Sequence, residues 1–127
     1  MEDKVLYRDL SYQLVGILFF AHNQLGRYAN EKQYGDFIET ELKGKAIRYE
    51  REKILDAHFL AERPGRHRVD FLIDGKMVLE LKCVGILTKE DYYQVQRYLH
   101  VLTLPLALLV NFREKFLRPR RILNARV

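Results

Sequence analysis

Two acidic residues and a lysine lie close together in a stretch that is typical of a β-hairpin. The stretch RHRVDFLIDGKMVLELK covers residues 66–82 and contains Asp70, Glu80 and Lys82. A strand that faces an apolar core should avoid carboxylates, because burying an unpaired charge is costly. Carboxylate oxygens bind divalent cations, and a bound cation polarises the groups beside it. The residue types indicate a metal site, and the open alternative is an ordinary hairpin with a solvated polar face.

The register of this hairpin decides whether the three side chains share a face, because side chains alternate between faces along a strand. A two-residue loop at positions 74–75 would turn Asp70 and Glu80 to opposite faces. A three-residue loop that closes a type I turn, with Gly75 left-handed, places Asp70, Glu80 and Lys82 on one face. We predict this odd loop or a bulge. The opposite, apolar face is then formed by Val69, Phe71, Ile73, Leu79 and Leu81.

The length and composition are those of one ordinary globular domain, which we expect to span residues 1–127. The single cysteine, Cys83, excludes an internal disulfide and a zinc site built from cysteines. It favours a reducing compartment, and we expect a cytoplasmic protein. The N-terminus resembles no signal peptide, and the run LVGILFFA is too short to span a bilayer, so no membrane association is expected.

The positive charge is concentrated at the C-terminal end. Residues 113–127 carry six arginine and lysine residues against one glutamate, and this net charge of +5 equals that of the whole chain. Such a basic segment can bind phosphates electrostatically. The equal alternatives are a solubilising tail or a final strand whose arginines face water. Phe116, Leu117, Ile122 and Leu123 indicate that part of the segment packs.

Hydrophobic periodicity predicts the elements that must position these residues. Helices are expected at residues 9–25, 30–43 and 88–103. Extended segments are expected at residues 46–60, 67–82 (the hairpin) and 105–112, with the loop ERPGR before the hairpin. The order is ααβββαβ, which predicts an α/β (α+β) fold with a mixed sheet flanked by helices.

Residues with known capping preferences mark the expected helix ends. Gly26 and Gly44 are expected to stop the first two helices, because glycine adopts the left-handed conformation at low cost. Asn30 is the expected N-cap of the second helix. Thr88 opens the third, with Asp91 three residues further on.

Two helices carry polar residues at positions that bear on the hairpin. Glu31 falls on the same stripe of the second helix as Tyr34 and Ile38, which makes it a third acid for the site. The alternative is that Glu31 stays solvated in the first turn, where it favours the helix dipole. Gln94 lies four residues before Tyr98 on the third helix, where its amide would orient Lys82 or a phosphate, or would be a surface glutamine.

Four motifs occur in one order along the chain, and together they resemble a known family. They are LG(x4)ExxY at Leu25–Tyr34, D(x9)ExK at Asp70–Lys82, QxxxYL at Gln94–Leu99 and LLVNF at Leu108–Phe112. This order resembles the GxxExxY protein family, a branch of the PD-(D/E)xK nuclease-like superfamily, over roughly residues 8–112. Tyr28 stands where the first glycine of the family name belongs, so the loop before Glu31 is expected to differ.

The resemblance implies a restriction-endonuclease-like core and a metal site on the hairpin. Asp70 and Glu80 would hold Mg²⁺ or Mn²⁺, with the backbone carbonyl of Leu81 as a further ligand. Glu31 would be an accessory acid that binds the metal directly or through water. Magnesium suits such a set, because it prefers oxygen ligands and keeps several waters.

The resemblance also implies the reaction. Lys82 would be the catalytic lysine and Gln94 the accessory polar residue on the following helix. We therefore expect metal-dependent hydrolysis of phosphodiester bonds in nucleic acid, with DNA as the expected substrate. The alternative is a nucleic-acid-binding or assembly module that keeps the fold without turnover. Cleavage of both strands of a duplex would need two active sites, and hence a homodimer.

Overall fold

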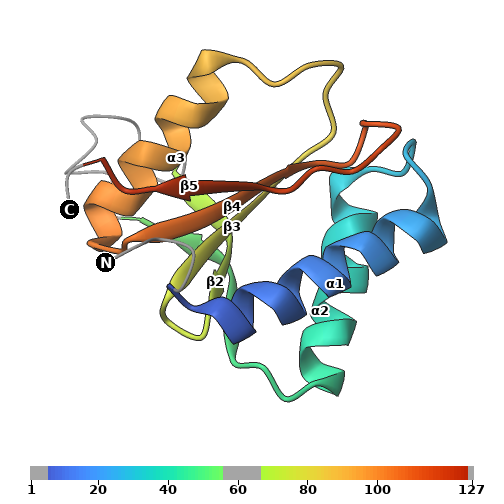
Figure 1. Cartoon of the computed structure of the whole chain (residues 1–127), viewed down its shortest axis with the longest axis horizontal. Coiled ribbons are helices and arrows are strands. Elements are labelled where there is room, and N and C mark those ends of the chain that lie inside the picture. The colour runs from blue at the N-terminus through green and yellow to red at the C-terminus, as the bar shows by residue number, and fades with distance from the viewer. Residues whose placement is uncertain (1–5, 56–66, 126–127) are drawn as a thin grey trace.

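The computed structural model describes residues 6–55 and 67–125 of the chain. Within these residues it contains three helices and five strands (Figure 1). The helices are α1 (Arg8–Leu25), α2 (Glu31–Gly44) and α3 (Lys89–Leu102). The strands are β1 (Tyr49–Ile54), β2 (Arg68–Ile73), β3 (Met77–Lys82), β4 (Leu106–Asn111) and β5 (Arg120–Leu123). The predicted α+β class is confirmed.

The five strands form one mixed sheet in the order β1-β2-β3-β4-β5. Neighbouring strands are antiparallel except for β3 and β4, which are parallel. A parallel pair cannot be joined by a tight turn, and α3 makes the crossover between β3 and β4 (Figure 1). The hairpin of β2 and β3 therefore lies in the middle of the sheet, with helices packed on both sides.

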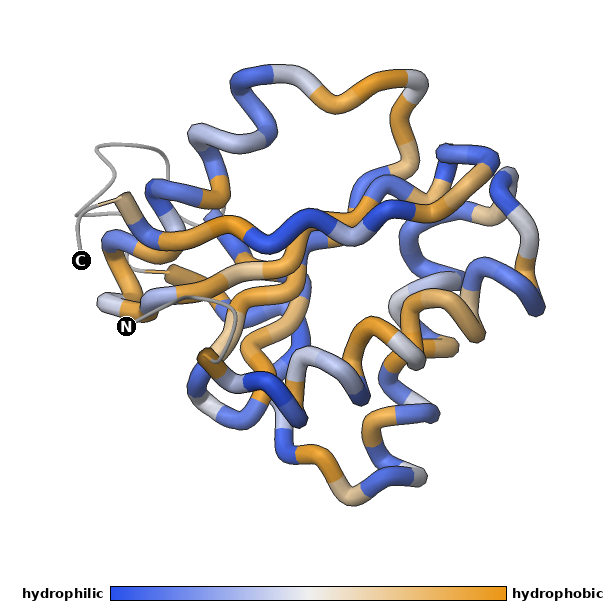
Figure 2. The backbone as a smooth tube through the Cα atoms, viewed as in Figure 1, coloured by the Kyte–Doolittle hydropathy of each residue, from blue (hydrophilic) through white to orange (hydrophobic). Residues whose placement is uncertain are grey.

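Two apolar cores lie on the two faces of the sheet. Alternate residues of β4 divide between them: Leu106, Leu108 and Val110 pack with α1 and α2, whereas Ala107 and Leu109 pack with α3. This division requires a strand that is apolar on both faces, as the continuous run in β4 provides. In Figure 2 the hydrophobic colour runs along the central strands and recurs at intervals along the helices.

The helix ends follow the local sequence, with one exception. Gly26 has a positive φ of 74° at the end of α1. The Asn30 side chain accepts the Gln33 N–H, which satisfies a helix donor that lacks an intrahelical partner. At the start of α3 the bond runs the other way, because the side chain of Asp91 accepts the backbone N–H of the N-cap, Thr88. Gly44 is the exception, because it is the last residue of α2 and Lys45 is the C-cap.

The predicted order lacked one strand. Residues 120–123 pair antiparallel with β4, and Ile122 is buried in the core beneath α3. The alternative of a final strand is therefore confirmed for this part of the basic segment, and Leu117 is also buried, while Phe116 is 77% exposed. The strand is short and rich in arginine, so its pairing depends on the neighbouring β4 rather than on its own pattern. The loop ERPGR, predicted before the hairpin, lies outside the described residues.

In the part of the chain that the structure describes, no helix is both long enough and apolar enough to cross a membrane.

Candidate active site

The hairpin has the register that the odd loop predicts. Phe71 pairs with Leu79, and Ile73 pairs with Met77, so the connection between the strands contains three residues. Continuing the same register places Asp70 opposite Glu80. The prediction of an odd loop is confirmed.

The turn type differs from the prediction. Asp74 and Gly75 have positive φ values of 53° and 64°, and the Lys76 N–H donates to the Ile73 carbonyl at 2.9 Å. Positive φ at both central positions is typical of a type I′ turn, not of the type I turn that we predicted. Its twist matches that of the two strands, and Asp followed by Gly is a favoured sequence for it.

Past the pair of Phe71 and Leu79, the side chains of Asp70 and Glu80 provide the hydrogen bonds between β2 and β3. The backbone N–H of Asp70 donates to Glu80 Oε1 at 2.8 Å, and the backbone N–H of Leu81 donates to Asp70 Oδ2 at 2.7 Å. Each carboxylate therefore satisfies a backbone donor of the opposite strand. Both acids are fixed in the gap between β2 and β3.

This arrangement corrects the prediction of one simple polar face. Val69 packs in the core beneath α3, whereas Phe71 packs in the core beneath α1 and α2, although alternation would place them together. β2 is thus irregular at Asp70, where its N–H bonds to a side chain. Asp70 lines a pocket on the α2 side, while Lys82 contacts side chains of α3.

Burial makes ionisation of both acids unfavourable. The Glu80 side chain is buried, and burial together with the nearby Asp70 charge raises its pKa well above the usual value. Burial raises the pKa of Asp70 to about 6, and the Leu81 N–H opposes this shift. The charge of Lys82 lowers the pKa of both acids. Two carboxyl groups held together against solvation form an arrangement that a cation stabilises.

Glu31 lies beside Asp70, as the motif order predicts. It is exposed at the start of α2, which agrees with the alternative of a solvated first-turn residue. It nevertheless lines the same pocket of about 500 Å³ as Asp70 and Leu81. Its negative charge raises the pKa of both Asp70 and Glu80. The structure therefore brings all three predicted acids and Leu81 to one place.

Glu52 also lines this pocket, as does Asp36, and sequence reasoning missed it. It lies in β1 between Arg51, which pairs with Phe71, and Lys53, which pairs with Val69. Its φ of 53° is uncommon for a residue other than glycine. Its carboxylate forms an ion pair with Arg68, with Oε1 3.5 Å from the guanidinium Nη1. No local pattern could have identified it, because its position opposite Asp70 depends on the pairing of β1 with β2.

Lys82 is held from α3. Its Nζ donates to Gln94 Oε1 at 3.2 Å and lies 3.7 Å from Asp91 Oδ1. The structure shows the contact between the Gln94 amide and Lys82, and the Gln94 side chain is half-buried. Asp91 was recognised as a helix-capping residue, but its proximity to Lys82 was not predicted. The lysine side chain is only 20% exposed, so its ammonium is held in a defined position.

Tyr98 is the other α3 residue close to the acids. It is buried at 2% exposure, and burial raises the pKa of its hydroxyl, followed by the charges of Glu80 and Asp70. From the sequence, Tyr98 falls on the apolar stripe of α3, so its position gives no sign that its hydroxyl lies near the acids. The QxxxY spacing was the available signal, because residues four apart lie on one side of a helix.

The predicted ligands are chemically suited to a hard cation. Carboxylates and a carbonyl provide only oxygen donors, the type that Mg²⁺ and Mn²⁺ accept. Among residues 6–55 and 67–125, however, no three histidine, cysteine, aspartate or glutamate side chains are arranged to hold a metal ion. Asp70 and Glu80 instead bond to backbone N–H groups. The donor types fit a metal, while their arrangement as it stands does not form a closed site.

Comparison with known proteins agrees with the fold. The family model of the PD-(D/E)XK nuclease superfamily matches residues 8–122. The chain therefore belongs to the PD-(D/E)XK nuclease superfamily, whose members are typically nucleases that use divalent metals. No curated protein and no solved structure matches the chain.

Proposed function

We propose that this protein is a metal-dependent nuclease of the GxxExxY branch that hydrolyses phosphodiester bonds in DNA. The observation that supports this most is the pair of reciprocal bonds that fixes Asp70 and Glu80 between β2 and β3. A purely structural hairpin would gain more from ordinary backbone pairing than from one buried and one half-buried carboxyl group. Such an arrangement is costly for stability and is typical of a functional site.

Four groups would hold the metal: Asp70, Glu80, Glu31 and the Leu81 carbonyl. When bound, Mg²⁺ or Mn²⁺ would stabilise charge on the phosphate and lower the pKa of a water molecule. Glu31 is the exposed member of the set, so it is the one that would adjust to bind directly or through water. Asp70 and Glu80 would keep their backbone bonds through one oxygen each and bind through the other.

Lys82 would act on the phosphate or on the attacking water. Its ammonium is a compact charge, and contacts with Gln94 and Asp91 restrict where it points. A fixed ammonium can stabilise a developing negative charge without first having to be oriented. Gln94 would then be a positioning residue that acts through Lys82.

The test is a cleavage assay on single-stranded and duplex DNA and on RNA, with Mg²⁺ or Mn²⁺. We expect Asp70→Asn and Lys82→Met each to reduce cleavage by about 100-fold or more. The matched controls are Glu41→Gln and Lys45→Met, an acid and a lysine of a surface hollow between α1 and α2. They should cleave like the wild type. Equal cleavage by wild type and both site variants would refute the proposal.

The alternative function is binding or assembly without turnover, and the open arrangement of the acids favours it. It predicts DNA binding that needs no metal and weakens with salt, with no cleavage under any metal. Light scattering in the same solutions would show whether the protein forms the homodimer that cleavage of both strands needs. Cleavage that depends on Asp70 would exclude this alternative.

A further inference from the structure

Two loops from opposite ends of the chain are joined by a reciprocal pair of hydrogen bonds. Arg27 Nε donates to the Arg113 carbonyl at 2.9 Å, and Arg113 Nε donates to the Arg27 carbonyl at 2.9 Å. The ring Nε2 of His22 lies 2.9 Å from the Glu114 carbonyl. The loop before α2 and the loop between β4 and β5 therefore lie together at one end of the molecule (Figure 1).

An exposed tyrosine, Tyr28, lies close to both arginines. The Cζ atoms of Arg27 and Arg113 are 5.1 Å and 5.5 Å from the centre of the Tyr28 ring. The tyrosine remains 73% exposed, so much of its surface is open to solvent. A second exposed aromatic, Phe116, follows in the other loop, with Lys115 Nζ 5.5 Å from its ring centre. We call Arg27, Tyr28, Arg113, Lys115 and Phe116 the Tyr28 surface.

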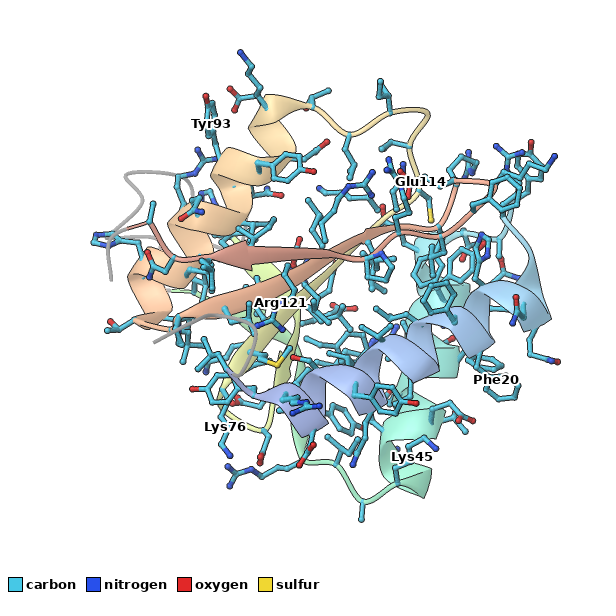
Figure 3. The ribbon with its side chains drawn as sticks, in the orientation of Figure 1. Phe20, Lys45, Lys76, Tyr93, Glu114 and Arg121 are labelled. Atoms are coloured by element: carbon cyan, nitrogen blue, oxygen red, sulfur yellow. The ribbon has the colours of Figure 1, made fainter. Side chains whose placement is uncertain are left out.

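The Tyr28 surface has a net positive charge. Glu114 lies between Arg113 and Lys115 in the sequence, and Arg120 neutralises its carboxylate through two bonds of 2.7 Å and 3.0 Å. Figure 3 shows Glu114 in the loop between β4 and β5, far from Lys45 and Phe20 on the opposite side of α1. Two of the three cations lie at the Tyr28 ring and the third lies at the Phe116 ring.

This surface adjoins the proposed active site. Tyr28 precedes Glu31 by three residues, at the start of α2. Arg113 interacts with the Cys83 side chain, and Cys83 directly follows Lys82. A chain bound along the Tyr28 surface would extend toward Glu31, the exposed acid of the proposed site.

We propose that the Tyr28 surface binds single-stranded nucleic acid. This proposal rests on the proposed nuclease function. Every base has a flat face, so stacking on an exposed ring needs bases that are not enclosed in a duplex. Tyr28 and Phe116 stack bases, and Arg27, Arg113 and Lys115 contact phosphates. A surface built only for duplex would need the cations but not the exposed rings.

Binding is measured by fluorescence anisotropy in a metal chelator, using the full chain, a labelled oligothymidine and a labelled duplex of equal length. Tyr28→Ala should weaken binding of the single strand by about tenfold or more, because stacking on that ring is lost. Tyr28→Phe should bind like the wild type, and so should Tyr12→Ala, which removes an exposed tyrosine from α1. Unchanged binding by Tyr28→Ala, or an equal loss by Tyr12→Ala, would overturn the proposal, as would an equal loss on the duplex.

Two further variants keep the result independent of folding and of catalysis. Lys115→Gln should reduce the slope of log K against log salt by about 0.7 for a single strand. Tyr28→Ala should melt like the wild type, because the ring is exposed. Glu41→Gln, outside both proposed sites, should bind the single strand normally. Because binding is measured in chelator, where metal-dependent cleavage does not occur, a failure of the proposed cleavage and a failure of this surface give different results.

Discussion

Asp70 and Glu80 are linked by the Asp70 N–H, which donates to the Glu80 carboxylate at 2.8 Å, while the Asp70 carboxylate bonds to the next residue of β3, Leu81. Both acids thereby replace backbone partners in the centre of the sheet. The link fixes their positions but leaves them poorly solvated, as the raised pKa of Asp70 shows. The two hydrogen bonds fix the carboxylates in place, while their poor solvation destabilises the folded protein, and both effects can be measured.

Asp70→Asn should stabilise the metal-free protein at pH 7.5. Burial raises the Asp70 pKa from 3.8 to about 6, so its ionisation opposes folding as pH rises through this window. Removing the charge should add roughly 1–3 kcal/mol to the free energy of unfolding above pH 6, at about 1.4 kcal/mol per pKa unit. Urea unfolding at several pH values measures this. The gain should shrink as pH falls toward 3.8, and a gain independent of pH would contradict the explanation.

Magnesium or manganese should raise the melting temperature of the wild type. An ion that binds only the folded state stabilises it by about 2.7 kcal/mol at one hundred times its dissociation constant. Asp70→Asn should lose this response, because a ligand and its charge are removed. Glu41→Gln, outside the proposed site, should keep it. Equal shifts for Asp70→Asn and the wild type, measured by calorimetry, would exclude Asp70 as a ligand.

Gln94→Ala should lower kcat with little change in KM, because Lys82 loses the amide that orients it. We expect a loss of about tenfold, smaller than for Lys82→Met, since Asp91 still lies near the ammonium. Gln94→Glu should recover part of the rate by keeping an acceptor oxygen. The exposed Gln24 on α1 provides the control, Gln24→Ala. A rise in KM alone would show that Gln94 binds substrate rather than positions Lys82.

Gly35→Ala should destabilise the protein by about 1–3 kcal/mol. A Cβ at Gly35 would collide with the Arg51 guanidinium, which bonds to Asp36 at 2.8 Å and to Glu39 at 2.9 Å. Gly16→Ala in α1 is the matched control, because a Cβ there would meet nothing within 4 Å. It should stabilise by about 0.5–1 kcal/mol, since alanine favours helix. Equal effects of the two substitutions in urea unfolding would show that Arg51 moves aside freely.

Much of the local structure follows from the sequence because it depends on near neighbours. Asn30 and Thr88 cap the helices that follow them, and Gly26 ends α1. The odd register of the hairpin also follows from requiring Asp70 and Glu80 to be opposite. The sequence fails for β5, because a four-residue strand rich in arginine is stabilised by its neighbour and not by its own pattern.

The site residues also fall into those that the sequence identified and those that it did not. Residue types and motif order were enough to select the acids Asp70, Glu80 and Glu31, which the structure brings together, and Gln94, which contacts Lys82. Their catalytic and metal-binding roles remain predictions. Glu52, Asp91 and Tyr98 escaped notice, because the first depends on strand pairing and the other two already had adequate local explanations as a cap and a core residue.

The sequence by itself determined which groups are available for chemistry and how the helices and the hairpin form, because spacing and capping act over a few residues. Only the tertiary structure decided that Asp70 and Glu80 bond to backbone between the strands, since this depends on an irregularity that alternation does not predict. It alone joined Arg27 and Arg113, which lie 86 residues apart. Packing of the sheet and helices sets such contacts, and no local pattern encodes them.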